Sequence, residues 1–213
     1  MNKHNIDYTL YLCTDRNIMS TETLEQAVEA AVKGGCTVVQ LREKNCTSYE
    51  FYELALSVKN ITDYYGVPLI INDRLDIAAA VNADGVHLGQ KDLPANISRA
   101  VLGESKIIGV SANNLEAALK AENDGADYLG VGAVFATGTK KDTKPVAIES
   151  LKEICSRVSI PVVAIGGIKR DNISLLNGTG ISGVAVISSV IGKPDISSAA
   201  RELKALFNPF ARL

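Results

Sequence analysis

One β/α unit of the fold can be read in residues 69–92, LIINDRLDIAAAVNADGVHLGQKD. Two short apolar runs, 69–71 and 85–88, have the length and composition of buried strands. Residues 75–81 between them carry apolar side chains at helical spacing. Polar residues follow each apolar run at once, Asn72 and Asp73 after the first and Gln90, Lys91 and Asp92 after the second. The stretch therefore predicts two parallel strands joined by a helix, with polar groups at the carboxyl end of each strand.

The same alternation extends over the rest of the chain. Strands are expected at 8–12, 38–41, 69–71, 85–88, 107–110, 128–131, 162–165 and 183–187. Helices are expected at 21–33, 48–65, 75–81, 97–102, 115–123, 148–157 and 196–207. Glycines suited to ending helices precede most strands, at 34–35, 66, 85, 103, 125 and 178–180.

Eight such units favour a closed barrel over an open sheet. An open doubly wound sheet would typically carry GxGxxG after its first strand, whereas residues 14–17 contain no glycine. We therefore predict an α/β protein, a single (β/α)8 TIM barrel that forms one domain over residues 1–213.

Composition excludes several classes of protein. The 22 basic and 24 acidic residues leave a net charge of −2, so no overall field attracts nucleic acid or an anionic membrane. No run approaches the roughly 18 apolar residues of a membrane span, and the amino terminus lacks an apolar signal core. The four cysteines show no CxxC spacing, as expected of reduced thiols. We expect a cytoplasmic protein without nucleic-acid or membrane partners.

Two carboxylates follow neighbouring strands. Asp73 ends the third strand and Asp92 follows the fourth. Oxygen ligands of this kind suit Mg²⁺, which keeps several waters and shares a substrate phosphate. Each residue alone has a simpler interpretation as a helix cap, Asp73 before Leu75 and Asp92 before Pro94. Together they predict a magnesium pair.

Cations follow other strands at the same rim. Arg42 and Lys44 come after the second strand and Lys140 after the sixth. Such cations beside a magnesium pair suit a diphosphate, whose charge two metal-bound carboxylates do not balance alone. The alternative is a solvated surface charge at each position, and for Glu43 a local salt bridge.

A second anion site is expected after the last two strands. Gly166-Gly167 and Ile187-Ser188-Ser189 match the phosphate site of many barrels, where backbone N–H groups and a short helix hold a phosphate. The alternative is a glycine turn required by packing. Residues 137–145, TGTKKDTKP, read as a lid over a ligand or as an exposed loop, and they lack the Walker spacing.

At these residues the chain resembles the thiamine-phosphate synthase family over its whole length. The resemblance is carried in order by Gln40 to Lys44, Asn72-Asp73, His87 to Asp92, Gly109 to Ser111, Thr137 to Lys140, Gly166 to Ile168 and Ile187-Ser188. It implies a transferase of thiamine biosynthesis that joins 4-amino-2-methyl-5-(diphosphooxymethyl)pyrimidine to 4-methyl-5-(2-phosphoethyl)thiazole, or to its carboxylated form. Diphosphate leaves first, and the thiazole nitrogen captures the pyrimidine cation.

The resemblance also implies roles for individual residues. The pyrimidine diphosphate would contact Gln40, Leu41, Arg42, Glu43, Lys44, Asn72, Ser111 and Lys140, among which Arg42, Lys44, Ser111 and Lys140 are the candidate catalytic groups. The thiazole phosphate would contact Thr137, Gly138, Thr139, Gly167, Ile187 and Ser188. Asp73 and Asp92 would bind Mg²⁺.

Two features bear on rival functions. Many relatives are expected to carry His at the position of Asn113, which puts an imidazole role there in doubt, and His87 reads as a hydrogen-bonded barrel residue. A related thiazole tautomerase would not need the metal and diphosphate residues and would be expected to use that missing histidine. A non-catalytic sensor of phosphorylated ligands would bind without turnover. Self-association is possible, but no interface can be read from the sequence.

Overall fold

Eight parallel strands close into a barrel in a computed structural model, which describes residues 5–136 and 146–208. The strands are β1 (Leu10–Cys13), β2 (Val38–Leu41), β3 (Leu69–Asn72), β4 (Gly85–Leu88), β5 (Ile107–Ala112), β6 (Tyr128–Gly132), β7 (Val162–Ile165) and β8 (Gly183–Val186). Each pairs with its neighbour in sequence, and β8 closes the ring on β1. The predicted barrel is confirmed.

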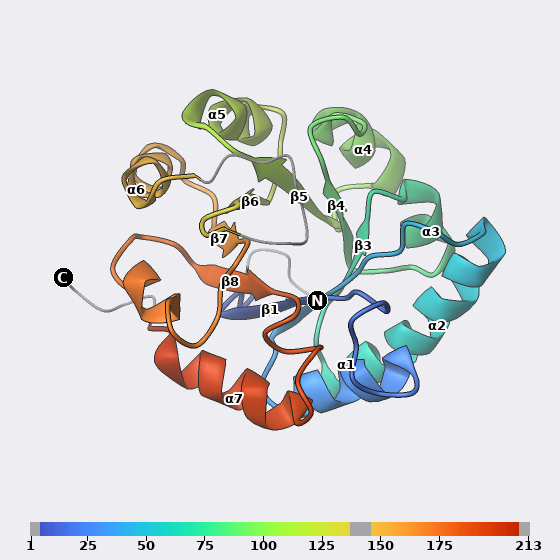
Figure 1. Ribbon diagram of the computed structural model, residues 1–213. Coiled ribbons are helices and arrows are strands. Elements are labelled where there is room, and N and C mark those ends of the chain that lie inside the picture. Colours follow the sequence, from blue (N-terminus) through green and yellow to red (C-terminus); the bar gives the residue numbers. More distant parts are fainter. Residues whose placement is uncertain (1–4, 137–145, 209–213) are drawn as a thin grey trace.

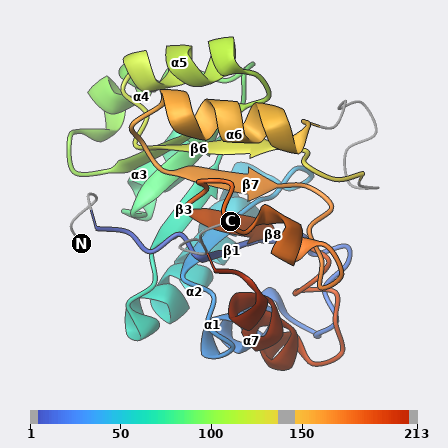
Figure 2. The ribbon, with the colours of Figure 1, turned by 90° about the vertical axis from the view of Figure 1, so that its left-hand side faces the viewer.

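Helices surround the barrel (Figure 1). They are α1 (Leu24–Lys33), α2 (Ser48–Tyr65), α3 (Leu75–Ala80), α4 (Ala95–Leu102), α5 (Leu115–Asn123), α6 (Ile148–Arg157), α7 (Ile196–Leu206) and the 3-10 helix η1 (Ile173–Leu176). A quarter turn of the view shows α5 and α6 on one side of the strands and α1 and α7 on the other (Figure 2). None of the helices in the described ranges is long and apolar enough to cross a membrane.

Local sequence determines the ends of several helices. The Thr23 side chain accepts a hydrogen bond from the backbone N–H of Gln26, and the Gln26 side chain accepts one from the backbone N–H of Thr23, which forms a capping box at the start of α1. Thr47 and Glu50 form the same arrangement at the start of α2. Gly66 ends α2 with φ at +67°, the left-handed conformation that glycine adopts without strain. Ordinary helix signals therefore place the long helices where the sequence predicts them.

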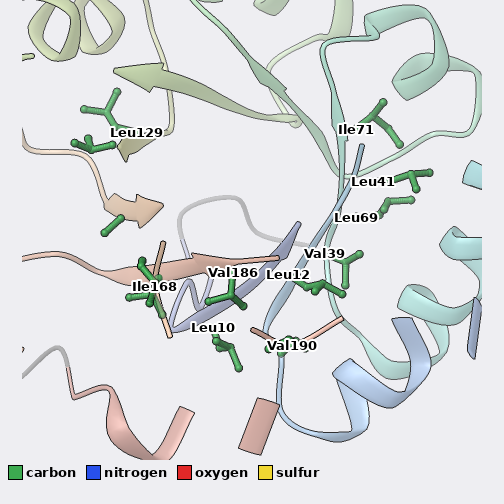
Figure 3. Packing of buried hydrophobic residues seen from close by; sticks show 14 of the residues in the cluster. Leu10, Leu12, Val39, Leu41, Leu69, Ile71, Leu129, Ile168, Val186 and Val190 are labelled. Atoms are coloured by element: carbon green, nitrogen blue, oxygen red, sulfur yellow. The ribbon is translucent and has the colours of Figure 1, made fainter. Parts of the chain in front are cut away.

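Two layers of apolar side chains hold the barrel. Outward-facing strand residues such as Leu12, Val39 and Leu69 pack against the helices (Figure 3). Inward-facing residues fill the barrel itself, with Tyr11 and Tyr128 the largest among them. Because side chains alternate along a strand, each strand contributes to both layers. The interior is packed, so ligands can approach only at its ends.

One expectation about the connections was wrong, and one short helix was not expected. Gly85 does not end a helix but begins β4, where a Cβ atom would lie 2.1 Å from the carbonyl oxygen of Ile107 on β5. Glycine is required there by the close approach of two strands. Between β7 and β8 the structure has η1, which the sequence does not predict because four residues are too short to show a helical pattern.

Candidate active site

Polar side chains replace the apolar interior at the carboxyl end of the barrel. Gln40, Asn72, His87 and Ser111 lie on the inward-facing positions of β2 to β5, two residues beyond interior apolar or glycine positions. The Ser111 hydroxyl lies 2.9 Å from Nε2 of His87, and Gln40 Nε2 donates to the Tyr11 hydroxyl at 2.9 Å. The barrel therefore gathers residues from four strands at one end, as the sequence predicts.

Asp73 is held in an unusual backbone conformation. Its φ is +63°, a left-handed value that few residues other than glycine adopt. Its carboxylate accepts a hydrogen bond from Lys44 Nζ at 2.5 Å, and the alternative interpretation as a helix cap is wrong, because α3 begins after Arg74 and has no side-chain cap. Strain of this kind persists where the surroundings require it, often at functional sites.

Asp92 lies beside Asp73 in a turn that its own side chain closes. Its Oδ2 atom accepts from the backbone N–H of Gly89 at 2.6 Å, and α4 has no side-chain cap, so the cap interpretation is wrong here as well. Burial raises the pKa of Asp73, but the Lys44 ammonium and a hydrogen bond with Asp92 outweigh burial, and the pKa lies below its ordinary value. Burial and the neighbouring Asp73 raise the pKa of Asp92. The two pKa values move apart because the carboxylates repel each other, and a bound cation would reduce that repulsion.

The carboxylate pair fits a magnesium ion better than a softer metal. The described ranges hold no cluster of three or more His, Cys, Asp or Glu side chains with metal-ligand geometry. Zinc sites need three or four protein ligands, whereas Mg²⁺ is commonly bound through one or two carboxylates, with water and substrate phosphate completing its shell. Asp73 and Asp92 therefore suit Mg²⁺ together with a phosphorylated ligand.

A cavity of about 240 Å³ opens beside these carboxylates at the ends of β1 and β2. It is lined by Asp15, Arg16, Asn17, Arg42, Glu43, Lys44 and Asn45. Three of these side chains are cationic and two, Asp15 and Glu43, are anionic. Arg16 pairs with Glu43 and Lys44 pairs with Asp73, so Arg42 is the cation of the lining for which no ion pair is found among the described residues. The structure thus brings Arg42 and Lys44 to one surface with the carboxylate pair.

Glu43 forms the local salt bridge that the sequence left open as an alternative. Arg16 Nε and Nη2 donate to its two carboxylate oxygens at 2.9 and 2.8 Å, and its side chain is only 7% exposed. The bidentate pair orients the Arg16 guanidinium at the cavity wall. Sequence reasoning missed Arg16, although the Thr14 to Asn17 segment directly follows the first strand, as the other candidate site residues follow theirs.

Asn72 carries an amide nitrogen that makes no hydrogen bond of good geometry among the described residues, although it lies close enough to Asp73 to help lower the pKa of that carboxyl. The residue is only 7% exposed, and a buried donor that is left unpaired is costly. It lies at the end of β3, directly before Asp73 and opposite His87 in the strand register. An acceptor atom of a bound ligand would satisfy it.

The Leu41 side chain points away from the barrel interior, whereas that of its neighbour Gln40 points into it. It occupies an outward-facing position of β2, is fully buried and packs in the layer between strands and helices (Figure 3). Its side chain therefore cannot reach a ligand at the barrel end, and only its backbone lies near Gln40 and Arg42.

The loops after β7 and β8 present free backbone donors. Gly167 has φ at +65°, and a Cβ there would lie 2.5 Å from the Ala136 carbonyl oxygen, so only glycine fits. Within the described part of the chain, no backbone acceptor pairs with the N–H groups of Gly167 and Ser188. Such groups suit a phosphate. The expected short helix is absent after β8, where Ile187 instead begins a turn whose carbonyl accepts from Val190 and Ile191.

Four predicted site residues, Thr137, Gly138, Thr139 and Lys140, lie outside the described residues. Asn113, at the position where many relatives were expected to carry histidine, is exposed and accepts a hydrogen bond from Asn114, which caps α5. The described site therefore consists of the ends of β1 to β5 with the turns after β7 and β8.

Comparison with known proteins places this barrel among its relatives. A family model described as thiamine monophosphate synthase matches residues 10–190. The chain is 59% identical to thiamine-phosphate synthase of Clostridium tetani, over 98% of this chain and all of that protein. It is 57% identical to thiamine-phosphate synthase of Clostridium botulinum, over 97% of each.

Solved structures agree with the sequence relatives. Thiamine phosphate pyrophosphorylase from Pyrococcus furiosus superposes with a TM-score of 0.88 at 41% identity, covering 96% of this chain and 97% of that one. A geranylgeranylglyceryl phosphate synthase from Thermoplasma acidophilum superposes with a TM-score of 0.69 at 16% identity, which is a likeness of fold alone.

Proposed function

The chain belongs to the thiamine monophosphate synthase family, whose relatives of high identity are transferases, and we propose that it joins the two halves of thiamine phosphate. One substrate is 4-amino-2-methyl-5-(diphosphooxymethyl)pyrimidine, and the other is 4-methyl-5-(2-phosphoethyl)thiazole or its carboxylated form. The products are thiamine phosphate and diphosphate, formed in thiamine biosynthesis by one barrel domain over residues 1–213.

The diphosphate end of the pyrimidine substrate lies, in this proposal, between the cavity and the carboxylate pair. Arg42, Lys44 and Lys140 bind its oxygens, and Gln40, Asn72 and Ser111 hold the pyrimidine side. Lys44 supports this placement, because the ammonium that bonds Asp73 also lines the cavity. Glu43 acts through Arg16, whose guanidinium it orients, and Leu41 contributes only backbone.

Asp73 and Asp92 would hold Mg²⁺ against the diphosphate. When bound, the ion neutralises charge that develops on the leaving group. The fit rests on two carboxylates from successive strand ends that are close enough to perturb each other's pKa. Lys44 is placed to keep Asp73 ionised before any cation arrives.

The thiazole phosphate would bind on the other side of the same barrel end. Gly167 and Ser188 offer backbone N–H groups, and Ile187 directly follows β8. Thr137, Gly138 and Thr139 precede Lys140 in sequence. Two anion sites on one rim hold the two substrates side by side. That arrangement brings the thiazole nitrogen toward the carbon that loses diphosphate.

The bond changes require no protein nucleophile. The carbon–oxygen bond to diphosphate breaks with its electron pair on the leaving group, and the thiazole nitrogen lone pair then forms the carbon–nitrogen bond. The side chains bind and orient, and their cations stabilise charge that grows on diphosphate. The described site holds no Ser–His–Asp or Cys–His arrangement in which a nucleophile would be activated.

The observation that carries the proposal is the joint placement of Lys44, Asp73 and Asp92 at the ends of three successive strands. A decisive test mixes purified protein, Mg²⁺ and both substrates, then measures diphosphate release and identifies the product by mass. Metal-dependent formation of thiamine phosphate is expected, with EDTA abolishing it. Binding of thiazole phosphate without any product would favour the tautomerase or the sensor.

Asp73→Asn keeps the size of the side chain and removes its charge. We expect the rate to fall by at least about 100-fold, because even outer-shell partners of metal sites cost 10- to 100-fold. Asp76→Asn is the matched control, since Asp76 lies three residues away, pairs with Arg74 on the surface and is 63% exposed. Equal activity in the two variants would contradict the assignment of Asp73.

A cytoplasmic location and self-association stay predictions from the sequence. Cell fractionation and light scattering of the purified protein would test them.

A further inference from the structure

Five polar side chains form a continuous hydrogen-bonded line through the barrel interior, which we call the interior chain. It runs from Gln40 Nε2 to the Tyr11 hydroxyl at 2.9 Å, to the Tyr128 hydroxyl at 2.8 Å, to His87 Nδ1 at 2.9 Å, and from His87 Nε2 to the Ser111 hydroxyl at 2.9 Å. Its two ends, Gln40 and Ser111, are candidate substrate residues. Its three middle members belong to no ligand site described above.

The direction of these hydrogen bonds follows from one buried hydrogen. Gln40 contacts Tyr11 through its amide nitrogen, which only donates, so the Tyr11 oxygen accepts that bond. The single hydroxyl hydrogen of Tyr11 must then find an acceptor, and Tyr128 is its one other hydrogen-bond partner among the described residues. Tyr11 is 1% exposed, so a hydrogen without an acceptor would be costly there.

The remaining bonds are then determined. Tyr128 accepts from Tyr11 and donates to Nδ1 of His87, which places the histidine hydrogen on Nε2. Nε2 donates in turn to the Ser111 oxygen. Because Ser111 accepts from inside the barrel, its own hydroxyl hydrogen is left to point into the site.

Two glycines leave the space that the chain occupies. A Cβ on Gly109 of β5 would lie 2.1 Å from Cζ of Tyr128, and a Cβ on Gly130 of β6 would lie 2.9 Å from Cε1 of His87. The Tyr128 ring also packs on Tyr8 and Tyr11, with ring centroids 4.8 and 5.9 Å apart. The middle of the chain is therefore confined on several sides, and its hydroxyl groups have little freedom to change partners.

Burial also keeps the two phenol groups neutral. It raises the pKa of both Tyr11 and Tyr128 well above the ordinary value, so both hydroxyls keep their hydrogens. A line of neutral donors and acceptors results, in which each bond polarises the next.

We propose that Tyr11, Tyr128 and His87 are positioning residues that hold Gln40 and Ser111 and make Ser111 a hydrogen-bond donor toward the bound pyrimidine diphosphate. This inference rests on the proposed function for the identity of that substrate. The direction of the interior chain does not depend on it.

Tyr128→Phe tests the positioning role, since it keeps the ring and removes the bridging hydroxyl. We expect kcat/KM for the pyrimidine diphosphate to fall about 10- to 100-fold, the usual effect of losing a supporting partner. KM for the thiazole phosphate stays unchanged. Tyr8→Phe is the matched control, because Tyr8 stacks on the same ring and its buried hydroxyl has no partner within the described ranges; its activity stays at the wild-type level.

A double-mutant cycle separates positioning from general damage. If Tyr128 acts through Ser111, Tyr128→Phe loses most of its effect in a Ser111→Ala background and keeps only the part that acts on Gln40 through Tyr11. A full additional loss in that background would overturn the proposal. If the wild-type protein makes thiamine phosphate and Tyr128→Phe makes it at the same rate, the proposal is also overturned. If the wild-type protein makes no product, the proposed function is contradicted instead.

Nitrogen-15 NMR of the histidine rings tests the direction without any substrate. The chain has only two histidines, His4 and His87, so a His4→Gln variant assigns the signals. We expect a neutral His87 ring with its hydrogen on Nε2. A hydrogen on Nδ1 would mean that the interior chain runs the other way, and it would overturn the donor role of Ser111 even if Tyr128→Phe did not fold.

Discussion

Removing Arg99 should destabilise the fold and leave catalysis intact. Arg99 lies on α4, and its Nη2 atom contacts Asp127 Oδ2 at 2.5 Å. Asp127 Oδ2 also accepts from the backbone N–H of Ile108 at 2.8 Å, and Arg99 reaches the carbonyl oxygens of Gly103 and Lys106. These contacts join the loops that lead into β5 and β6, at the opposite end of the barrel from the candidate site.

The expected loss follows from burial of the pair. The Arg99 and Asp127 side chains are 13% and 15% exposed, so Arg99→Leu takes the guanidinium from a carboxylate that has little access to water. Removing one partner of a buried pair costs about 3–5 kcal/mol, and the residual exposure favours a value of about 3. In a domain of this size, about 2–4 °C of melting temperature accompany each kcal/mol, which predicts a fall of roughly 6–12 °C.

The assay is urea unfolding followed by circular dichroism, with steady-state activity at 25 °C on the same samples. Arg170→Leu is the matched control, because Arg170 pairs with Glu202 at 3.0 Å on the surface, where the side chains are 71% and 44% exposed. Such exposed pairs contribute about 0–1 kcal/mol. Equal losses in the two variants would refute the argument from burial, and a large fall in kcat of folded Arg99→Leu would refute the separation of the two barrel ends.

Three further changes test other parts of the structure. Lys44→Met should raise KM for the pyrimidine diphosphate about 10-fold or more, because it removes a cation from both the cavity and Asp73; steady-state kinetics with an unchanged KM would contradict this. Gly183→Ala should lower the free energy of unfolding in urea by about 3 kcal/mol, because its Cβ would lie 1.7 Å from the Tyr8 carbonyl oxygen. A decrease below about 1 kcal/mol would show that β1 and β8 can move apart. Burial raises the pKa of Cys36 to about 12 from about 9 in an unfolded chain, so its contribution to stability is complete below that lower pH and is lost as the pH rises toward 12. Between about pH 8 and 10 the free energy of unfolding of the wild type should therefore fall by about 1.4 kcal/mol more than that of Cys36→Ala. Parallel pH dependences of the two proteins would count against a buried thiol.

The fold was readable from sequence because each strand signal is local. Residues 38–41, 85–88 and 162–165 form strands within the predicted bounds, and α2, α5 and α6 also match. Apolar runs bounded by turn residues and helical spacing between them need no long-range information. The closure of the barrel follows from their number and order, since consecutive parallel strands pair with their neighbours.

The chemistry of the strand ends was only partly readable. Asp73 and Asp92 could each have been a helix cap, and only the structure shows that Asp73 adopts a positive φ and bonds Lys44, which lies 29 residues earlier in the sequence. Arg16 was missed because its importance comes from Glu43 across two strand ends. Pairings between loops depend on the barrel register, which no single segment specifies.

Side-chain parity would have limited the predicted role of Leu41 to its backbone without any coordinates. In the Gln40 to Lys44 motif, positions 40 and 42 have the same parity, and position 41 has the opposite one. If Gln40 and Arg42 face the pocket, Leu41 must face the helices, where it is buried. A resemblance assigns roles to every residue of a motif. The alternation of side chains along a strand shows that only Gln40 and Arg42 can face the candidate site, while Leu41 packs against the helices.

The same parity explains why the interior chain could not be read from sequence. Tyr128 begins β6 as an ordinary aromatic strand residue, and Gly109 stands in β5 as an ordinary strand glycine. Their relation exists because the two are paired in register across the sheet, so the missing side chain of one leaves room for the ring of the other. That ring carries the hydroxyl between Tyr11 and His87, and thereby links residues on β1 and β4 that are not neighbours in the barrel. The packed interior of this barrel therefore connects to its candidate site through polar contacts as well as through apolar burial.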